Sequence, residues 1–314
     1  VTVTRGGYSK RTRTELYRSQ RRGGKGVKGA ALKQDDVVDH FFVASTHDWL
    51  LFFTNKGRVY RAKVHELPDA GRDARGQHVA NLMAFKPDES IAAVLSIKDY
   101  AAAPYLVLST KSGLVKKSPL TEYDSPRTGG LIAISLRDGD EVVGATLATD
   151  KDELLLVSRK GMSLRFSAQN DSIRSMGRSA TGVIGMKFRA GDELLAMARV
   201  GGSDKDLFVF TATDGGFGKK SPLDEYRIQN RGGIGIKAAK VNEDRGGLVG
   251  ALVISDTDEI LAITSNGSVM RTDAAEIRQT GRDSMGVRLV NLDEGVTLLS
   301  VTKNSEDADT VTPA

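Results

Sequence analysis

The chain has 314 residues, a formal net charge of +5, 34 glycines, 7 prolines and no cysteine. The lack of cysteine excludes a disulfide scaffold, a thiolate zinc site and a cysteine nucleophile, and no apolar run approaches the ~18 residues that a membrane-spanning helix needs. Because the sequence starts at Val1 without an apolar leader, we expect a segment of a longer cytoplasmic protein that does not associate with membranes.

The first feature along the chain is a basic N-terminal segment. Residues 1–30 contain nine lysines and arginines but one acidic residue, Glu15, whereas the rest of the chain is slightly acidic. A strongly basic segment on a near-neutral body is typical of a polyanion-binding patch. A solvated basic arm is the alternative.

A hairpin-like pattern then recurs six times. Apolar residues lead into a short polar turn, a glycine and, four positions later, a basic residue. The turn glycines are Gly7, Gly57, Gly113, Gly161, Gly216 and Gly267. Glycine adopts the positive φ that hairpin turns often need, so we place six repeats with first strands near residues 4, 52, 106, 154, 207 and 260.

Each repeat has two further landmarks. A second glycine followed by an apolar residue comes later in the unit, and an acidic step then leads into another apolar run. The second landmarks are Gly26–Val27, Gly76 as the weakest member, Gly130–Leu131, Gly182–Val183, Gly233–Ile234 and Gly286–Val287. We read four short strands in each repeat.

A single four-stranded unit cannot bury both of its faces, but six units arranged around an axis can. The sequence therefore predicts an all-β, six-bladed, propeller-like disc over residues 1–302. Residues 303–314 are expected to form a short, acidic, disordered tail. An open solenoid of the same units is the alternative.

The residue four positions after each hairpin glycine is basic in every repeat. Equivalent positions of a radial array lie on one ring, so these residues predict a positive stripe that follows the phosphates of a bent duplex. A purely solubilising role is the alternative. The six residues are Arg11, Arg61, Lys117, Arg165, Lys220 and Arg271.

A heptad in the first repeat combines three cations with three glycines. The glycines let the backbone approach a phosphate closely, and the cations supply charge-assisted hydrogen bonds. The sequence thus favours DNA binding by this loop. Its residues are Gln20, Arg21, Arg22, Gly23, Gly24, Lys25 and Gly26.

This heptad resembles the GyrA-box of bacterial DNA gyrase at every position, and the six repeats resemble the blades of the C-terminal β-pinwheel domain in the gyrase A protein. The resemblance implies a disc that wraps double-stranded DNA, so that an ATP-dependent type II topoisomerase introduces negative supercoils. It implies that the partners are DNA, the remainder of the gyrase A protein and the gyrase B protein. It also implies that blades exchange a strand with a neighbour, which the residues themselves neither show nor exclude.

The resemblance places the cleavage tyrosine, ATP and Mg²⁺ outside this chain, so we expect no catalytic residue and no cofactor here. The four histidines, His40, His47, His65 and His78, show no metal-ligand spacing. We therefore expect no metal site either.

A second heptad in the fifth repeat matches the first at five of seven positions. We interpret it as a possible second DNA contact; common ancestry of the repeats is the alternative. Its residues are Gln229, Asn230, Arg231, Gly232, Gly233, Ile234 and Gly235.

Two alternatives for the whole chain stay open. The equivalent domain of topoisomerase IV has similar blades, but its box is usually degraded, and the box here is intact. A β-propeller that binds proteins and no DNA is the other alternative, which the box and the repeated cation disfavour.

Overall fold

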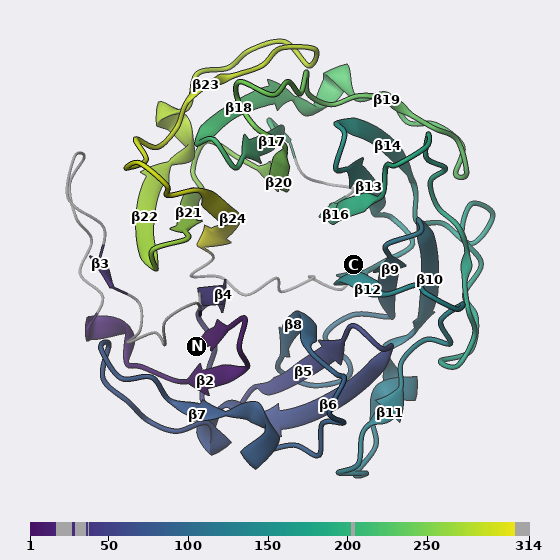
Figure 1. Ribbon diagram of the computed structural model, residues 1–314. Helices are drawn as coiled ribbons and strands as arrows, with labels where there is room; N and C mark the ends of the chain where they lie inside the picture. Colours follow the sequence, from purple (N-terminus) through teal and green to yellow (C-terminus); the bar gives the residue numbers. More distant parts are fainter. Residues whose placement is uncertain (17–26, 29–35, 37, 202–204, 305–314) are drawn as a thin grey trace.

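The computed structural model describes residues 1–16, 27–28, 36, 38–201 and 205–304. In this part of the chain, 24 strands form six four-stranded antiparallel sheets that follow one another around a ring (Figure 1). We number these sheets blades 1 to 6 in the order of their hairpins. This arrangement confirms the predicted all-β, six-bladed disc.

Three strands of each blade come from one repeat. Two of them form the predicted hairpin: β1 (Thr2–Thr4) with β2 (Tyr8–Lys10), β5 (Trp49–Thr54) with β6 (Arg58–Lys63), β9 (Tyr105–Thr110) with β10 (Leu114–Pro119), β13 (Glu153–Ser158) with β14 (Met162–Ser167), β17 (Phe208–Thr213) with β18 (Phe217–Pro222), and β21 (Glu259–Thr264) with β22 (Ser268–Asp273). The third is the innermost strand of the blade: β4 (Val38–Phe41), β8 (Ile91–Ile97), β12 (Val142–Ala148), β16 (Leu194–Val200), β20 (Leu248–Ile254) and β24 (Leu298–Asn304).

The fourth, outermost strand of each blade comes from another repeat. In blades 1 to 5 it belongs to the next repeat along the chain, and in blade 6 it belongs to the first repeat. In blade order these exchanged strands are β7 (Gln77–His78), β11 (Leu131–Ile132), β15 (Val183–Ile184), β19 (Ile236–Lys237), β23 (Val287–Arg288) and β3 (Val27–Lys28). The blades therefore exchange strands, as the resemblance implied.

The exchanged strand β3 closes the ring. It pairs antiparallel with β22 of blade 6, with Lys28 opposite Ser268 and Val27 opposite Val269. The first repeat thus contributes an edge to the last blade, and the alternative of an open solenoid is wrong.

Short 3₁₀ turns follow several hairpins and exchanged strands. They are η1 (Thr14–Leu16), η2 (Val64–Glu66), η3 (Val79–Asn81), η4 (Leu120–Tyr123), η5 (Leu223–Glu225) and η6 (Ala274–Glu276). The turns after the hairpins direct the chain toward the outer edge, where each exchanged strand adds to a neighbouring blade.

All six hairpin glycines have positive φ, which confirms the reason for their recurrence. At Gly113 a second constraint operates, because an added methyl group would overlap the carbonyl oxygen of Met186. Met186 belongs to the segment that carries β15. The hairpin glycine therefore makes the sharp turn and also leaves room for the exchanged segment.

The hydrophobic core lies between neighbouring blades. Between blades 2 and 3, for example, Leu51 and Phe53 of β5 join one cluster with Leu106 and Leu108 of β9, and all four are fully buried. The central strands are covered on both faces, which explains continuous apolar runs such as that of β13.

Two details of the sequence interpretation need correction. The second landmark of the fifth repeat is Gly235–Ile236, since Gly235 has φ +81° and directly precedes β19, whereas Gly233 is not among the glycines with positive φ. Strand β24 extends to Asn304, so Lys303 and Asn304 belong to a blade rather than to the tail. Residues 305–314 of the predicted tail lie outside the described residues.

Candidate nucleic-acid interface

Two of the six repeated cations are buried. Lys117 Nζ donates to the carbonyl of Ala168 at 2.7 Å and lies 3.1 Å from Asp150, and its side chain is 0% exposed. Lys220 makes the corresponding contacts with Ala274 and Asp256 and is 5% exposed. Both lysines form hydrogen bonds that connect one blade to the next. Because their ammonium groups are buried, a phosphate cannot reach them. The predicted stripe is wrong at these two positions.

The four arginines at this position are partly exposed, and each faces a carboxylate. Arg61 meets Asp124 at 2.9 Å and covers the ring of Trp49 at 4.3 Å. The other pairs are Arg11 with Asp69 at 3.5 Å, Arg165 with Glu153 at 2.5 Å, and Arg271 with Glu259 at 2.7 Å. Their contact with DNA stays a prediction. Because a carboxylate already balances each charge, these residues form local ion pairs and no continuous positive stripe.

Three more lysines, one position earlier in the odd-numbered blades, are also buried. Lys10 Nζ donates to the carbonyls of Gly71, Arg72 and Ala74 at 3.0, 2.5 and 2.7 Å. Lys116 donates to the carbonyl of Arg178 in the same way. Lys219 donates to the carbonyls of Gly281, at 3.1 Å, and of Arg282. Each ammonium group therefore holds the segment that leads to an exchanged strand.

Burial lowers the pKa of these ammonium groups, to about 8 for Lys10, about 7 for Lys116 and about 8 for Lys219. The sequence shows these residues as cations next to the repeated position but does not show that they point inward. Blades 2, 4 and 6 carry Tyr60, Leu164 and Met270 there, so the lysine clamp alternates around the ring.

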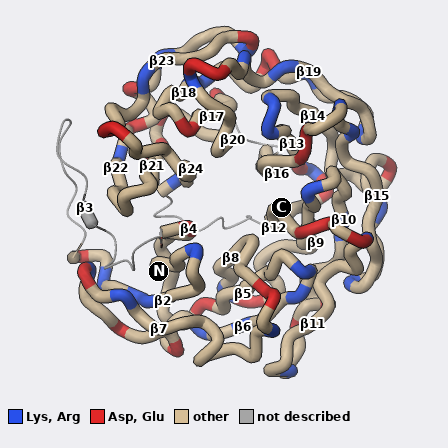
Figure 2. Tube along the Cα trace, in the orientation of Figure 1, with Lys and Arg blue, Asp and Glu red and all other residues tan. Residues whose placement is uncertain are grey.

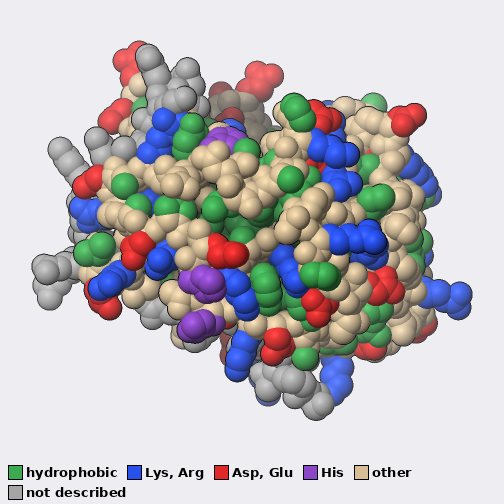
Figure 3. Space-filling view, turned by 90° about the horizontal axis from the view of Figure 1, so that it is seen from below, with side chains coloured by type: hydrophobic (Ala, Val, Ile, Leu, Met, Phe, Trp, Pro, Cys, Tyr) green, Lys and Arg blue, Asp and Glu red, His purple; other side chains and the backbone are tan. Residues whose placement is uncertain are grey.

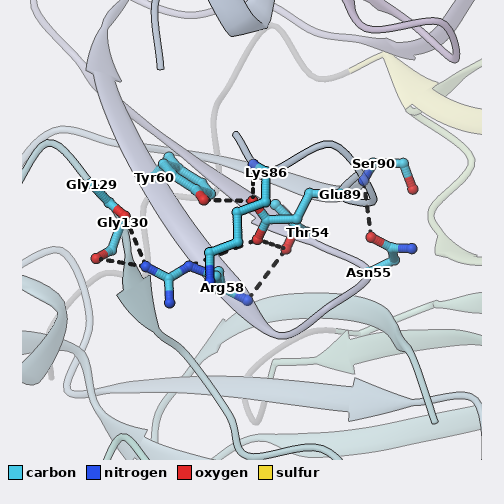
Figure 4. A network of polar contacts seen from close by, with 9 residues as sticks. All are labelled: Thr54, Asn55, Arg58, Tyr60, Lys86, Glu89, Ser90, Gly129 and Gly130. Atoms are coloured by element: carbon cyan, nitrogen blue, oxygen red, sulfur yellow. Dashed lines mark hydrogen bonds and ion pairs between the residues drawn. The ribbon is translucent and has the colours of Figure 1, made fainter. Parts of the chain in front are cut away.

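In blade 2, a buried carboxylate and an arginine take the place of the buried lysine in contacting the exchanged segment (Figure 4). Glu89, whose side chain is 0% exposed, accepts hydrogen bonds from Tyr60 at 2.5 Å and Thr54 at 3.0 Å and lies 3.8 Å from Arg58 Nε. Arg58 Nη2 then donates to the carbonyl of Gly129 at 2.8 Å, in the segment that leads to β11. Burial, together with the bond to Glu89, raises the pKa of Tyr60. A buried carboxylate thus orients an arginine toward the exchanged segment.

The second heptad lies in the segment that leads to β19, at the outer edge of blade 4. Arg231 donates from Nε to the carbonyl of Ser172 at 2.9 Å and from Nη1 to that of Ile184 at 2.6 Å. The backbone N–H of Gly232 donates to the carbonyl of Gly185 at 2.7 Å. The heptad therefore joins two neighbouring exchanged segments.

The bond from Arg231 recurs in the neighbouring repeats. Arg178 and Arg282, which also stand four residues before a positive-φ glycine, donate to the carbonyls of Ile132 and Lys237 in the preceding exchanged strands. This recurrence supports a structural role for Arg231. Among the remaining heptad residues, Gln229 bonds to the backbone of Arg165 and Gly233 to that of Lys187, while Asn230 and Ile234 are exposed. Binding of DNA by this heptad stays a prediction.

The first heptad, residues 20–26, lies outside the described residues. The strand that follows it directly, β3, forms the outer edge of blade 6. The chain therefore re-enters the described structure at the perimeter of the disc.

Metal sites and membrane spans were searched over the described ranges. No group of three or more histidines and carboxylates there could hold a metal ion. In the same ranges, no helix has the length and apolar character to span a bilayer.

The sequence matches the family model described as "DNA gyrase C-terminal domain, beta-propeller" in six segments, residues 1–45, 48–98, 104–149, 152–200, 208–255 and 258–305. It is 63% identical to the DNA gyrase A protein of Streptomyces coelicolor and 57% identical to that of Mycolicibacterium smegmatis. Each alignment covers 98% of this chain but 36% of the relative. The chain thus spans about a third of the length of these curated relatives.

Two solved structures have the same fold. One, a DNA gyrase A C-terminal domain, is 27% identical with a TM-score of 0.84, and the alignment covers 97% of this chain and 98% of that one. The other, the C-terminal domain of DNA topoisomerase IV, is 31% identical with a TM-score of 0.77, and the coverage is 98% and 94%. With the family model matched in all six repeats, the chain belongs to the family of DNA gyrase C-terminal β-propeller domains.

Proposed function

We propose that this chain binds duplex DNA and wraps it around the outer edge of the disc. The observation that carries the proposal is the intact heptad Gln20–Gly26, which directly precedes the strand at the outer edge of blade 6. Its cations and glycines suit a phosphate backbone. The closed ring gives such a path a continuous convex support, and the membership in the gyrase family agrees with it.

In the parent enzyme, the wrapped DNA would be presented for ATP-dependent strand passage, and negative supercoils would result. The remainder of the gyrase A protein and the gyrase B protein are the partners in this proposal, and the enzyme acts in the cytoplasm. We place DNA cleavage, ATP and Mg²⁺ in those other parts. The present chain then contributes DNA geometry and performs no bond-breaking step.

The equivalent role in topoisomerase IV is the second candidate, since a solved domain of that enzyme is 31% identical to this chain. The curated relatives with 52–63% identity are DNA gyrase A proteins, and the box is intact. Both observations favour gyrase. A protein-binding propeller without DNA would leave the composition of the heptad unexplained.

The proposal is tested by the salt dependence of duplex binding. Wrapping predicts that log K falls by about 0.9 per log unit of salt for each phosphate contacted, with many contacts in total. A duplex of about 150 bp should bind with a steeper slope than one of about 20 bp, because a short duplex cannot follow the edge. Equal, shallow slopes for both lengths would contradict wrapping and favour a protein-binding propeller.

A further inference from the structure

Three arginines occupy one equivalent position on consecutive blades. Each directly follows a buried apolar residue that ends the turn after a hairpin, namely Ile173, Tyr226 and Ile277, which are at most 5% exposed. The arginines themselves, Arg174, Arg227 and Arg278, are exposed. Since one residue points inward and the next outward, the turn projects each guanidinium away from the core.

The backbone fixes these arginines in register. The residue after each one forms a parallel bridge with a repeated cation: Ser175 with Lys117, Ile228 with Arg165, and Gln279 with Lys220. These cations lie in β10, β14 and β18, the second hairpin strands of blades 3, 4 and 5. The three guanidinium groups therefore stand at matching places on the outer edges of three successive blades.

The arginines differ from the six repeated cations in what surrounds them. Within the described residues, no hydrogen bond or ion pair of the Arg174, Arg227 or Arg278 side chain is found, whereas each repeated cation has a carboxylate partner. At the same position, the second repeat has Pro68 and the third has Asp124. Within the described residues, the exposed arginines at this position are thus found on blades 3 to 5. The first repeat, which supplies the outer strand of blade 6, has Arg18 at the same spacing, but Arg18 lies outside the described residues.

A second row of residues also differs between blades, with basic residues on blades 4 and 5. The outward residue of the exchanged strand is Ile132 on blade 2, Ile184 on blade 3, Lys237 on blade 4 and Arg288 on blade 5, and all four are exposed. Lys237 forms an ion pair with Asp283 at 3.8 Å, and both side chains are more than half exposed. At this position, the exchanged strand is therefore apolar on blades 2 and 3 and basic on blades 4 and 5.

Basic and acidic residues both occur around the whole ring (Figure 2). Seen from the side of blades 1 and 2, basic side chains are interspersed with acidic and histidine side chains (Figure 3).

We propose that the DNA path is an arc along the outer edges of blades 3, 4 and 5, with Arg174, Arg227 and Arg278 as its phosphate contacts, and that the path does not follow the outer edges of blades 1 and 2. The inference rests on the proposed DNA binding and replaces the repeated cations with a different set of residues. The arc leads toward blade 6, whose outer strand directly follows the first heptad.

The test is a triple variant, Arg174→Gln, Arg227→Gln and Arg278→Gln, measured by salt titration of binding to a duplex of about 150 bp. Loss of three phosphate contacts should flatten the slope of log K against log salt by about 2.7. The control, Lys56→Gln, Lys98→Gln and Arg137→Gln, removes the same charge from exposed sites in the β5–β6 turn, after β8 and between β11 and β12. It should leave the slope nearly unchanged.

The position of the path is tested separately, by site-directed cleavage of the bound DNA. The chain has no cysteine, so a single introduced cysteine can carry a DNA-cleaving iron chelate at a known place. Gln279→Cys on blade 5 and Asp69→Cys on blade 1 occupy the same bridge position. The chelate at position 279 should cut bound DNA, and the chelate at position 69 should not. Equal cutting from both, or equal slopes for the two triple variants, overturns the arc. Absence of steep, length-dependent binding by the unmodified chain overturns the proposed function instead.

Discussion

The Nη1 of Arg231 donates a 2.6 Å hydrogen bond to the carbonyl oxygen of Ile184, a residue of the preceding repeat. The most box-like segment of the described structure therefore holds one exchanged strand against the next. An arginine with two carbonyl acceptors at 2.6 and 2.9 Å is already satisfied on one face. Removal of the Arg231 side chain should therefore mainly reduce the stability of the fold.

Arg231→Ala is expected to lower the free energy of unfolding by about 1–3 kcal/mol, because two carbonyl groups lose their donor. Arg189→Ala, at an exposed position in the connection to β16, should stay within about 0.5 kcal/mol of the unmodified chain. Urea unfolding measures both. If Arg231→Ala instead shortens a DNase footprint from one end at unchanged stability, the segment is a second DNA contact.

Two glycines of the same heptad should respond differently to alanine. At Gly235, φ is +81° and a methyl group would overlap the carbonyl oxygen of Ser163, whereas at Gly233 the nearest atom would be 3.8 Å away. Gly235→Ala should therefore lower the melting temperature by several degrees, since a strained backbone costs about 1–3 kcal/mol before the overlap is counted. Gly233→Ala should be nearly neutral. Similar melting temperatures for the two variants would refute this account of strand exchange.

The buried ammonium group of Lys116 predicts a pH effect. Its pKa in the folded chain is about 7, below the unperturbed value of 10.5, so between these values the unfolded state binds more protons. Stability from this group should thus increase as pH rises from 7 to 9, by at most about 1.4 kcal/mol per pH unit. In Lys116→Met this contribution is absent. Urea unfolding at pH 7, 8 and 9 should show a difference from the unmodified chain that grows with pH.

The control for this effect is Lys56→Met, at an exposed site in a hairpin turn. Its difference from the unmodified chain should not change over the same pH range. Parallel pH profiles for Lys116→Met and the unmodified chain would show that the lysine is not buried as described.

Closure of the ring can be trapped chemically. Residues directly opposite each other in an antiparallel pair have Cβ atoms about 4.5–5.5 Å apart, so Lys28→Cys with Ser268→Cys should form an intramolecular disulfide on mild oxidation. Ser268→Cys with Gln77→Cys, on the outer strand of blade 1, should not. The naturally cysteine-free chain makes the product unambiguous in non-reducing electrophoresis. Equal crosslinking of the two pairs would be inconsistent with β3 on blade 6.

The periodic part of the fold could be predicted from the sequence, because hairpin glycines mark each repeat and need positive φ. Strand exchange was implied only by the family resemblance. The residues themselves do not show it, since a two-residue strand such as β11 carries too little pattern to distinguish its own hairpin from that of a neighbour. The burial of Lys117 could not be predicted from the sequence either. A lysine that donates to a carbonyl of the next blade has the same local sequence as one that faces solvent.

The sequence contains a signal for the exposed arginines. Arg174, Arg227 and Arg278 each follow an apolar residue at one place in three successive repeats. At the position of the six repeated cations, the structure buries the two lysines and pairs each of the four arginines with a carboxylate. In the part of the chain that the structure describes, the less regular position is the exposed one, with Arg174, Arg227 and Arg278 on blades 3 to 5.

Wrapping itself is measured most directly by the topology of closed circular DNA. The chain is bound at saturation, the DNA is relaxed with a nicking-closing enzyme, the protein is removed, and the linking number is read from a gel. A wrap with positive crossings predicts a linking number above that of DNA relaxed without protein, and a smaller increase for the triple variant of Arg174, Arg227 and Arg278 at matched occupancy. A linking number equal to that of protein-free DNA, at an occupancy verified by gel shift, would contradict wrapping by this disc.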